Sequence, residues 1–306
     1  MGQRIQLNRK NQFLIIDSSG GIAQYYLNEN GEQQDIIYGY ASNKEKVGSM
    51  GDVLFPWPGR IENCQYDFAE EHYNLSGVRV KDGHANHGFA KFVPWEIVQS
   101  GRDSAQLRFK TSKEEYAEKG YPFALELTLS YALDDSGMTC MASVINTGDK
   151  SAPFGLGFHP YFSLGAESIS NLALQINANK MVEFGPDLKP TGELLNISGE
   201  LDYTKTKKIG KQVVDNCYAD LNFENGIAKT TLSNDNGEQV VVWQDESFPY
   251  LQLYSADTIP DPHKRRGLAI EPQTCTGFAF NMPKMGLRVL RPSEKFTGSW
   301  GVTPIS

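Results

Sequence analysis

The feature of this chain that most constrains its fold is a repeated succession of short apolar or alternating segments. Within residues 123–131, leucine or tyrosine recurs at every second position from residue 125 onward. A period of two is typical of a β-strand with one buried face. The other segments that we interpret as strands span residues 13–17, 22–27, 95–99, 105–109, 138–146, 172–176, 239–243, 250–254, 286–290 and 296–300.

Tight-turn residues separate these segments, at Asn30-Gly31, Asp135–Gly137 and Asp235–Gly237 among others. The clearest helical signal is one short stretch, residues 112–120, with a capping serine at its start and a glycine at its end. Strands that follow strands without long helices favour a large antiparallel β-sandwich over a parallel α/β sheet. No shift in composition marks a boundary, so we expect residues 1–306 to form a single domain.

Charge and hydropathy exclude several classes of partner. The net charge of −8 argues against general binding to nucleic acid and against docking on anionic lipid. No segment approaches the roughly 20 apolar residues of a membrane span, and the first residues lack the apolar core of a secretory signal. We therefore expect a cytoplasmic protein, either a monomer or a homodimer.

The four cysteines are far apart in the sequence and form no Cys-x-x-Cys pair. Their spacing fits neither a zinc ribbon nor a disulfide framework, so reduced thiols in a cytoplasm are the simplest interpretation. The cysteines are Cys64, Cys140, Cys217 and Cys275.

Residues 154–162 are apolar and aromatic apart from one histidine followed directly by a proline. Pro160 restricts His159 to extended backbone and removes a hydrogen-bond donor from the ladder. We interpret His159 as a titratable imidazole at a strand end, able to transfer protons near neutral pH. We expect Tyr161 and Phe162 to offer an aromatic floor to the C–H face of a sugar. The alternative is a histidine hydrogen-bonded within a core.

Arg60 and His87 stand in two loops that contain glycine. Residues 55–61 include two prolines, which hold Arg60 at the end of a stiff segment where its guanidinium can bind sugar oxygens or a carboxylate. The alternative is an ion pair at a loop tip. His84 and His87 are weak candidates for a metal site, because no third Cys or His lies nearby in the sequence. A hydrogen-bonding histidine on a turn is the favoured interpretation.

Two carboxylates occupy further strand-end positions. Asp215 follows two β-branched residues, and Glu271 follows an apolar run and precedes Pro272. A partly buried glutamate has a raised pKa, which suits a base that works near neutral pH. The alternatives are a turn-forming aspartate and a glutamate paired within the core.

Together these motifs resemble the aldose 1-epimerase (galactose mutarotase-like) family, and the resemblance covers residues 10–302, essentially the whole chain. The His-Pro-Tyr-Phe and Glu-Pro motifs are its most specific parts. In the family's order, the matching motifs are Gly59-Arg60-Ile61, Asn86-His87-Gly88-Phe89, Phe158-His159-Pro160-Tyr161-Phe162, Asp215-Asn216-Cys217-Tyr218 and Glu271-Pro272-Gln273-Thr274, with Phe278-Ala279-Phe280-Asn281 and Ser299-Trp300-Gly301 at the end.

The resemblance implies a twisted antiparallel β-supersandwich with a sugar cleft across one face. It also implies that Glu271 is the general base, that His159 is the general acid, and that Arg60, His87 and Asp215 hold the sugar hydroxyls.

Two positions depart from the family pattern. Gly59 stands where many relatives carry asparagine, and residues 275–277 read Cys-Thr-Gly where proline is common. Both departures concern the choice of sugar more than the chemistry.

The implied reaction interconverts the α and β anomers of an aldose. It requires a proton taken from the C1 hydroxyl and a proton given to the ring oxygen, followed by rotation about C1–C2 and ring closure. A carboxylate and an imidazolium supply both without redox chemistry, so we expect no metal and no cofactor. We also expect nearby carboxylates to keep His159 protonated.

Three alternatives remain open. A glycosidase would use Asp215 and Glu271 as its carboxylate pair. A sugar-binding protein of the same fold would have lost the base or the acid, whereas both are present here. A hexose-6-phosphate 1-epimerase would need a phosphate contact from Arg79 or residues 263–266, for which a solvated loop is the favoured interpretation.

Overall fold

The alternating segments form antiparallel hairpins, and the longest of them shows why. The computed structural model describes residues 3–42, 45–186 and 188–305. Strand β13 (Leu125–Asp134) pairs with β14 (Gly137–Asn146) along its whole length, and the apolar side chains of β13 are buried at every second position. A two-residue turn joins them, and the carboxylate of Asp134 accepts hydrogen bonds from the backbone N–H groups of Ser136 and Gly137.

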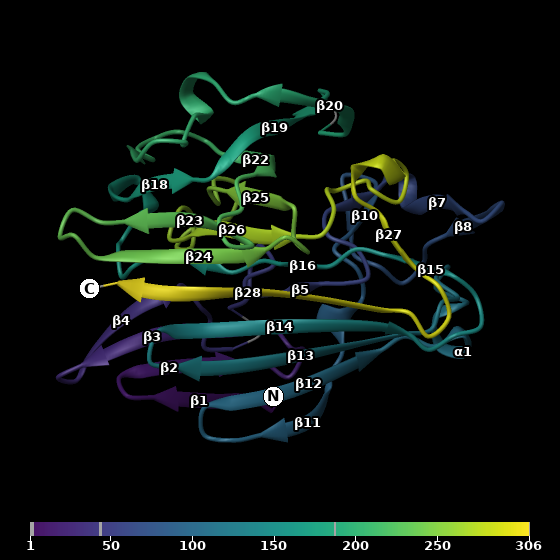
Figure 1. Cartoon of the computed structure of the whole chain (residues 1–306), viewed down its shortest axis with the longest axis horizontal. Helices are drawn as coiled ribbons and strands as arrows, with labels where there is room; N and C mark the ends of the chain where they lie inside the picture. The colour runs from purple at the N-terminus through teal and green to yellow at the C-terminus, as the bar shows by residue number, and fades with distance from the viewer. Residues whose placement is uncertain (1–2, 43–44, 187, 306) are drawn as a thin grey trace.

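This hairpin lies within a nine-stranded antiparallel sheet that forms one layer of the molecule (Figure 1). In spatial order its strands are β11 (Glu96–Ser100), β12 (Ser104–Lys110), β13, β14, β28 (Lys295–Ile305), β24 (Gln239–Asp245), β23 (Ile227–Ser233), β18 (Ala173–Ile176) and β21 (Lys207–Lys208).

A twelve-stranded sheet forms the second layer and carries three of the site residues described below, His159, Asp215 and Glu271. Ten of its strands follow the order β1 (Ile5–Arg9), β2 (Gln12–Ile16), β3 (Ile22–Glu29), β4 (Glu32–Ile37), β17 (Tyr161–Phe162), β26 (Leu268–Gln273), β25 (Tyr250–Tyr254), β22 (Asp215–Leu221), β19 (Ala178–Phe184) and β20 (Pro190–Asn196). The other two are β16 (Gly157–Phe158), which pairs with β26, and β5 (Val53–Leu54), which pairs with β16.

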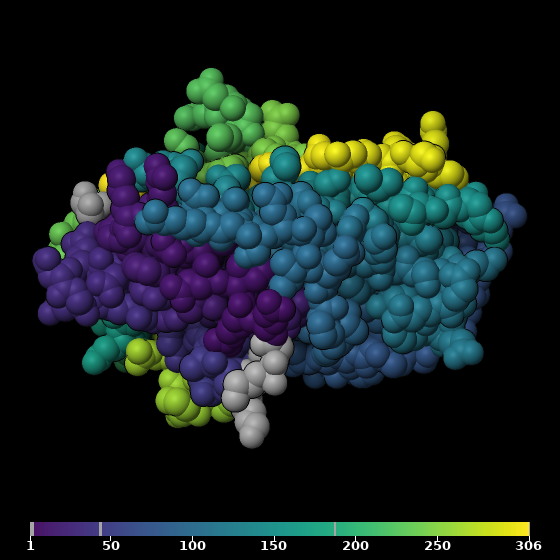
Figure 2. All heavy atoms as spheres, turned by 90° about the horizontal axis from the view of Figure 1, so that it is seen from below, coloured from purple at the N-terminus to yellow at the C-terminus, as the bar shows by residue number. Residues whose placement is uncertain are grey.

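The two layers meet at one edge, where β1 lies beside the β11–β12 turn. The backbone N–H of Asn8 donates to the carbonyl of Arg102 at 2.8 Å, and the Arg102 guanidinium donates to the Asn8 side chain at 3.1 Å. Figure 2 shows this side of the molecule, with the purple N-terminal strands lying against the blue β11–β12 region. These contacts close the sandwich along this edge.

Three small sheets and six short helices complete the described structure. The sheets are β6 (Arg60–Ile61) with β10 (His84–Asn86) and β9 (Val80–Lys81), β15 (Ala152–Phe154) with β27 (Arg288–Leu290), and β7 (Gln65–Phe68) with β8 (Glu71–Asn74). The helices are α1 (Lys113–Tyr116) and the 3₁₀-helices η1 (Glu62–Cys64), η2 (Ala90–Phe92), η3 (Ile169–Asn171), η4 (Gly199–Leu201) and η5 (Pro283–Met285).

The one helix expected from the sequence is present with the expected cap at its start, but it ends at Tyr116, and Gly120 closes the turn that follows. The side chain of Ser112 accepts a hydrogen bond from the backbone N–H of Glu115 at 3.2 Å. Gly120 has a φ of +79°, and a Cβ there would lie 2.0 Å from the carbonyl oxygen of Asn74, so only glycine fits. Across the described residues, every helix is too short or too polar to span a lipid bilayer.

The core lies between the two layers and draws apolar side chains from Ile5 through to Val302. Strand β26 is exceptional in that all six of its residues are buried, because one face packs into this core while the other lies beneath the cavity described next. The all-β antiparallel sandwich expected from the sequence is confirmed. The strand expected at residues 286–290 begins only at Arg288, because Gly286 has a φ of +96° and ends η5.

Candidate active site

A cavity of about 500 Å³ opens on the twelve-stranded sheet, within the roughly 300–1,000 Å³ of small-molecule sites. All five residues that the sequence marked as catalytic or binding line this cavity, although they come from five separate parts of the chain. They are Arg60 at the start of β6, His87 directly after β10, His159 between β16 and β17, Asp215 at the start of β22, and Glu271 in β26.

Glu271 is held in the middle of the sheet. Its position pairs with Gln252 of β25, and only 2% of its surface is exposed. The side-chain amide of Gln273 donates to Oε2 at 3.0 Å, which orients the carboxyl group. Burial raises the pKa of Glu271 well above its usual value, and the neighbouring Asp215 carboxylate raises it further. Burial therefore favours the protonated form of Glu271.

His159 is fixed by its backbone and by its ring. Its N–H donates to the carbonyl of Asp52 at 3.0 Å, and its own carbonyl accepts from the N–H of Gly51 at 2.9 Å. The imidazole stacks on the ring of Tyr161, with centroids 5.1 Å apart and planes 24° apart. This arrangement holds Nε2 of His159 at 3.4 Å from Oε1 of Glu271.

The protonation of His159 differs from the sequence-based expectation. Burial lowers its pKa to about 3, although the Asp52 carboxylate acts in the opposite direction. The expectation that nearby carboxylates keep His159 protonated is wrong, because the loss of hydration outweighs their attraction. Burial thus shifts both members of the pair toward their neutral forms, because it raises the pKa of Glu271 and lowers that of His159.

A buried ionic group lies behind His159. Asp52, whose carbonyl holds the His159 backbone, is itself buried and contacts two ammonium groups. Lys46 forms a close ion pair with Oδ1, and Nζ of Lys91 lies 3.7 Å from Oδ2. Burial lowers the pKa of Lys91 to about 8, while Asp52 raises it. The sequence contained no clear signal for this group, since none of the three residues lies within one of the motifs.

The expected aromatic floor is also wrong in its residues. Tyr161 and Phe162 are buried and do not line the cavity. The hydroxyl of Tyr161 donates to the carbonyl of Gly48 at 2.6 Å, so this ring supports His159 and a loop. The aromatic rings that do face the cavity are those of Tyr254, Phe184 and Phe278.

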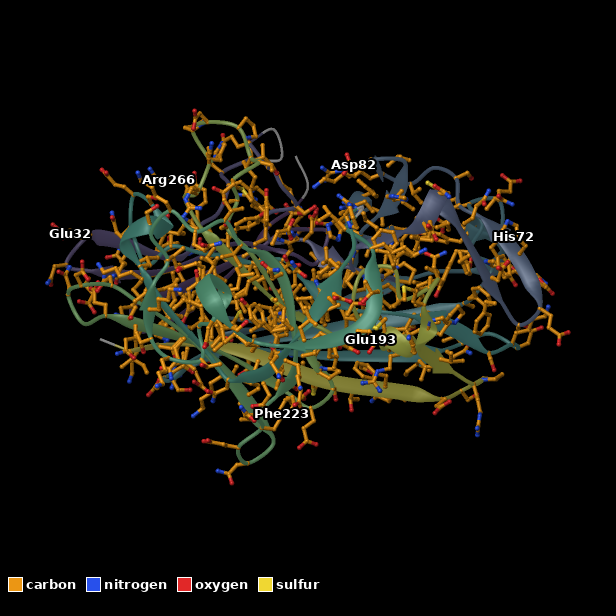
Figure 3. All side chains as sticks on the ribbon, turned by 90° about the horizontal axis from the view of Figure 1, so that it is seen from above. Glu32, His72, Asp82, Glu193, Phe223 and Arg266 are labelled. Carbon is orange, nitrogen blue, oxygen red and sulfur yellow. The ribbon has the colours of Figure 1, made fainter. Side chains whose placement is uncertain are left out.

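His87 and Arg60 keep hydrogen-bond donors for a ligand. Nδ1 of His87 accepts the backbone N–H of Gly59 at 3.0 Å, which leaves the proton of the neutral ring on Nε2. Burial keeps this ring neutral by lowering its pKa well below the usual value. Arg60 forms an ion pair with Asp82 at 2.7 Å, and Figure 3 shows Asp82 at the outer edge of the molecule. Arg60 is thus both a cavity residue and a partner in an ion pair.

Asp215, the first residue of β22, also lines the cavity. Its Oδ1 accepts a hydrogen bond from the side-chain amide of Gln252 at 3.0 Å. Desolvation raises the pKa of Asp215, whereas the positive charges of Lys81 and Arg60 lower it. A hydrogen-bonded carboxylate in this position is suited to accept sugar hydroxyl protons in hydrogen bonds.

The two departures from the family pattern lie against each other. Gly59 has a φ of +63°, and a Cβ added to it would lie 2.5 Å from Cα of Gly277. Position 59 therefore has no room for a side chain, because the two loops touch there, next to Arg60 and Phe278. The sequence marked both positions but gave no reason to connect them.

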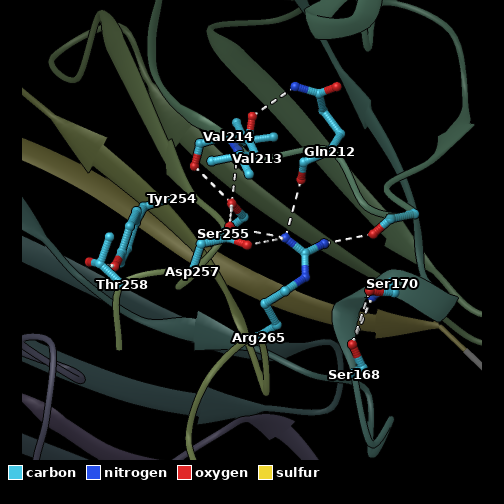
Figure 4. Close-up of polar contacts among 11 residues, drawn as sticks. Ser168, Ser170, Gln212, Val213, Val214, Tyr254, Ser255, Asp257, Thr258 and Arg265 are labelled. Atoms are coloured by element: carbon cyan, nitrogen blue, oxygen red, sulfur yellow. Dashed lines mark hydrogen bonds and ion pairs between the residues drawn. The ribbon is translucent and has the colours of Figure 1, made fainter. Parts of the chain in front are cut away.

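A polar network fixes the rim of the cavity that contains residues 258–260 (Figure 4). The guanidinium of Arg265 donates to both carboxylate oxygens of Asp257, at 2.9 and 3.0 Å, and to the carbonyls of Gln212 and Gly210. At the same rim, the hydroxyls of Tyr254 and Thr258 are hydrogen-bonded at 2.6 Å. The rim is thereby held in place by side chains of the same segment.

Sequence reasoning missed Gln252, Tyr254 and Ser49 as cavity residues. Gln252 and Tyr254 alternate along β25 and share a face, so knowledge of the β25–β26 pairing would have placed them beside Glu271. Ser49 had no local signal.

Within residues 3–42, 45–186 and 188–305, no three His, Cys, Asp or Glu side chains form a group able to hold a metal ion. Nδ1 of His84 accepts the N–H of Asn63 at 3.0 Å, and His87 holds Gly59 as described. Both histidines thus serve as hydrogen-bonding residues, as the sequence favoured, although only His87 lies at a bend of the chain and His84 begins β10.

Comparison with known proteins agrees with this arrangement. A family model described as aldose 1-epimerase matches residues 3–302. YihR of Escherichia coli K12, an uncharacterized protein, is 28% identical over 238 residues, which cover 77% of this chain and 73% of YihR.

Solved structures share the fold. A GalM/aldose epimerase homologue from C. elegans has a TM-score of 0.87 at 18% identity, with 100% of this chain and 99% of that chain covered. The galactose 1-epimerase of Lactobacillus acidophilus NCFM has a TM-score of 0.80 at 20% identity, with 97% and 92% covered. With a family model that spans nearly the whole chain, the protein belongs to the aldose 1-epimerase family.

Proposed function

We propose that this protein is a mutarotase that interconverts the α and β anomers of a hexose, with Glu271 as general base and His159 as general acid. The observation that carries the proposal is the buried pair of Glu271 and His159, 3.4 Å apart on the wall of a sugar-sized cavity. One carboxyl and one imidazole that share a proton are the minimum needed to move protons at the two oxygens bonded to C1.

In the proposed reaction, a proton first moves within the pair, from Oε1 of Glu271 to Nε2 of His159. Glu271 then takes the proton of the C1 hydroxyl, the C1–O5 bond breaks, and His159 gives its proton to O5. The products are an open-chain aldehyde, a protonated Glu271 and a neutral His159. Rotation about C1–C2 and the reverse proton transfers close the ring as the other anomer.

The direction of the two pKa shifts supports this sequence. Burial favours neutral His159 and protonated Glu271, which is the state that follows ring opening. The protein thus stabilises the open-chain stage, and the cyclic sugar must stabilise the ionic form of the pair through its own hydrogen bonds. Arg60, His87 and Asp215 are the proposed partners of the remaining hydroxyls.

The two other function classes are less well supported. In a glycosidase, two carboxyl groups flank the scissile bond, whereas the group in contact with Glu271 is the imidazole of His159. A sugar-binding protein without activity has no need to bury an acid and a base side by side at the cost of shifting both pKa values.

The test is catalysis by the wild-type protein. Polarimetry on freshly dissolved aldoses, and exchange NMR on the same sugars at anomeric equilibrium, should show interconversion faster than the uncatalysed rate. A panel of neutral and charged hexoses, together with aryl glycosides of both anomers, covers all three function classes. Release of aryl alcohol would support the glycosidase, and saturable binding without faster interconversion of any sugar would support the binding protein.

A further inference from the structure

Positive charges that the proton transfers do not use gather at one end of the cavity. Arg79 and Lys81, immediately before and within β9, line the cavity together with Ser49. Lys91 lies underneath with only 3% of its side chain exposed. Nη1 of Arg79 and Nζ of Lys91 both donate to Oγ of Ser49, at 3.4 and 3.3 Å. We call Ser49, Arg79 and Lys81 the cationic wall.

These charges are incompletely neutralised by the protein. Among the described residues, no carboxylate oxygen lies within 4.0 Å of the charged nitrogens of Arg79 or Lys81. Lys91 shares its one carboxylate, Asp52, with Lys46. A chain with a net charge of −8 therefore carries at its cavity two positive charges that no ion pair of the described residues neutralises, although the charge of Lys81 also acts on the carboxylate of Asp215.

The charges act on the same space as the catalytic pair. After burial, the charges of Lys91, Arg79 and Lys81 are among the causes that lower the pKa of His87. Lys81 also affects His159 and Asp215, which lie on other walls of the cavity. A ligand that reaches Glu271 and His159 consequently lies in the field of the cationic wall.

Ser49 adds a second indication. It is buried and has a φ of +61°, a backbone conformation that strains a residue other than glycine. Its hydroxyl accepts from two cations at once and retains its own proton for donation. A guanidinium, an ammonium and a hydroxyl at one place are the donors that oxyanions require.

We propose that the cationic wall binds an anionic substituent, a phosphate or a carboxylate, of an aldose whose C1 lies at Glu271 and His159. The inference rests on the proposed mutarotase function and narrows its substrate class to aldoses with an oxyanion away from C1. A neutral hexose offers nothing that balances Arg79 and Lys81. The wall therefore selects the substrate, while the buried pair performs the chemistry.

The experiment compares glucose, glucose 6-phosphate and glucuronate by exchange NMR at anomeric equilibrium. Catalysed kcat/KM should be at least about tenfold higher for one of the two anions than for glucose. The double variant Arg79→Gln/Lys81→Gln should reduce that preference by about tenfold, so that kcat/KM for the anion approaches that for glucose. Lys113→Gln/Lys150→Gln, which removes two exposed charges outside the cavity, is the matched control and should keep the preference.

Salt gives an independent measurement. Raising the ionic strength from about 0.01 M to about 1 M shortens the Debye length from about 30 Å to about 3 Å. The kcat/KM for the anionic aldose should fall severalfold, whereas that for glucose should not. The ratio between glucose 6-phosphate and glucuronate tells whether the wall fits a phosphate or a carboxylate.

The outcomes separate this inference from the function on which it rests. Equal kcat/KM for glucose and both anions, unchanged in Arg79→Gln/Lys81→Gln, overturns the anion site and leaves the mutarotase intact. If no sugar is turned over, the mutarotase proposal fails, and calorimetric binding of the three sugars then decides the site. Tighter binding of an anion that disappears in Arg79→Gln/Lys81→Gln supports the wall, and equal or absent binding overturns it.

Discussion

Strands β13 and β26 both lie near the middle of a sheet, but they bury their side chains in different ways. Along β13, burial alternates, so that Leu127 and Leu129 face the core while Thr128 and Ser130 are only partly covered. Along β26, all six residues are buried, including Glu271. One strand separates its apolar and polar faces, and the other places a carboxyl group where water is excluded.

The difference separates stability from chemistry. Burial of the leucine side chains of β13 is favourable, and each stabilises the fold by about 1.5–3 kcal/mol. Burial of Glu271 makes its charged form unfavourable, which raises its pKa and opposes folding whenever that charge is present. β13 therefore contributes to the fold alone, whereas β26 gives up some stability to hold a group with altered acidity.

Of the substitutions in the two strands, Glu271→Gln should have the largest effect on the reaction. Glutamine keeps the shape but cannot take the C1 proton, so kcat for the best aldose should fall about 10²–10⁴-fold while the sugar still binds. Exchange NMR and calorimetry on the same variant measure the two quantities. A variant with near wild-type kcat would exclude Glu271 as the base.

The stability of the same variant has a defined pH dependence. The pKa of Glu271 is raised in the folded state, so the stability that its neutral form provides is complete below its ordinary pKa and is lost as pH rises through the raised value. Glutamine has no such loss, so the Tm of Glu271→Gln relative to wild type should increase as pH rises. A constant difference across pH would contradict the buried, uncharged carboxyl group.

Leu129→Ala tests the other strand. Leu129 is fully buried, and the lost packing should lower the free energy of unfolding by about 2–5 kcal/mol. Activity per folded molecule should stay the same, because the residue does not line the cavity. Ala132→Ser, on the exposed side of β13, is the control and should change stability by less than about 0.5 kcal/mol. Denaturant unfolding with parallel activity measurements checks all three statements.

The pH dependence of kcat/KM tests the protonation of the buried pair, Glu271 and His159. Because burial lowers the pKa of His159 to about 3, no fall in rate should accompany a decrease in pH through 6.5, the ordinary pKa of imidazole. On the alkaline side, the rate should fall about tenfold per pH unit once the pair loses its only proton at the raised pKa of Glu271.

This assigns the alkaline limb to the proton shared by the pair, not to an isolated imidazolium. The profile of His159→Asn on the best aldose, in comparison with wild type, measures it. An acidic limb near pH 6.5 in the wild-type enzyme would show that His159 is solvated and ordinary.

The smallest expected effect on the reaction is that of His87→Asn. Asparagine tolerates the left-handed backbone of this position, where φ is +62°, but cannot place a donor where Nε2 lies. We expect KM to rise by about tenfold with little change in kcat, since the lost hydrogen bond contributes about 0.5–1.5 kcal/mol. Steady-state kinetics decide, and a fall in kcat with unchanged KM would transfer the catalytic role from His159 to His87.

The contrast between strands also explains which elements were predictable. Alternation placed β14 and β25 to within one residue of their ends and β13 to within three, because each has one buried face. Strands β20 and β22 have no comparable pattern. In β20 only Pro190 is buried, since the strand lies at the edge of its sheet, and its sequence therefore contains no period to detect.

The sequence predicted residues that line the cavity, but it did not predict their protonation or their hydrogen-bond partners. Motifs placed Glu271 and His159 among the candidates, and the fold brings them together. The protonation of His159 could not be predicted, because it depends on how completely β5, β16 and β26 exclude water from the imidazole. The role of Gln252 required the pairing of β25 with β26, which no local pattern specifies.

The contact between Gly59 and Gly277 has a consequence for how this enzyme could be redesigned. Since the two backbones touch, the aperture of the cavity at this point is set by main-chain atoms, with no side chain available to enlarge or narrow it. Any larger residue at position 59 would have to displace the loop that follows β26. A change of sugar preference here therefore requires the exchange of both loops together, and libraries that vary single positions would not reach it.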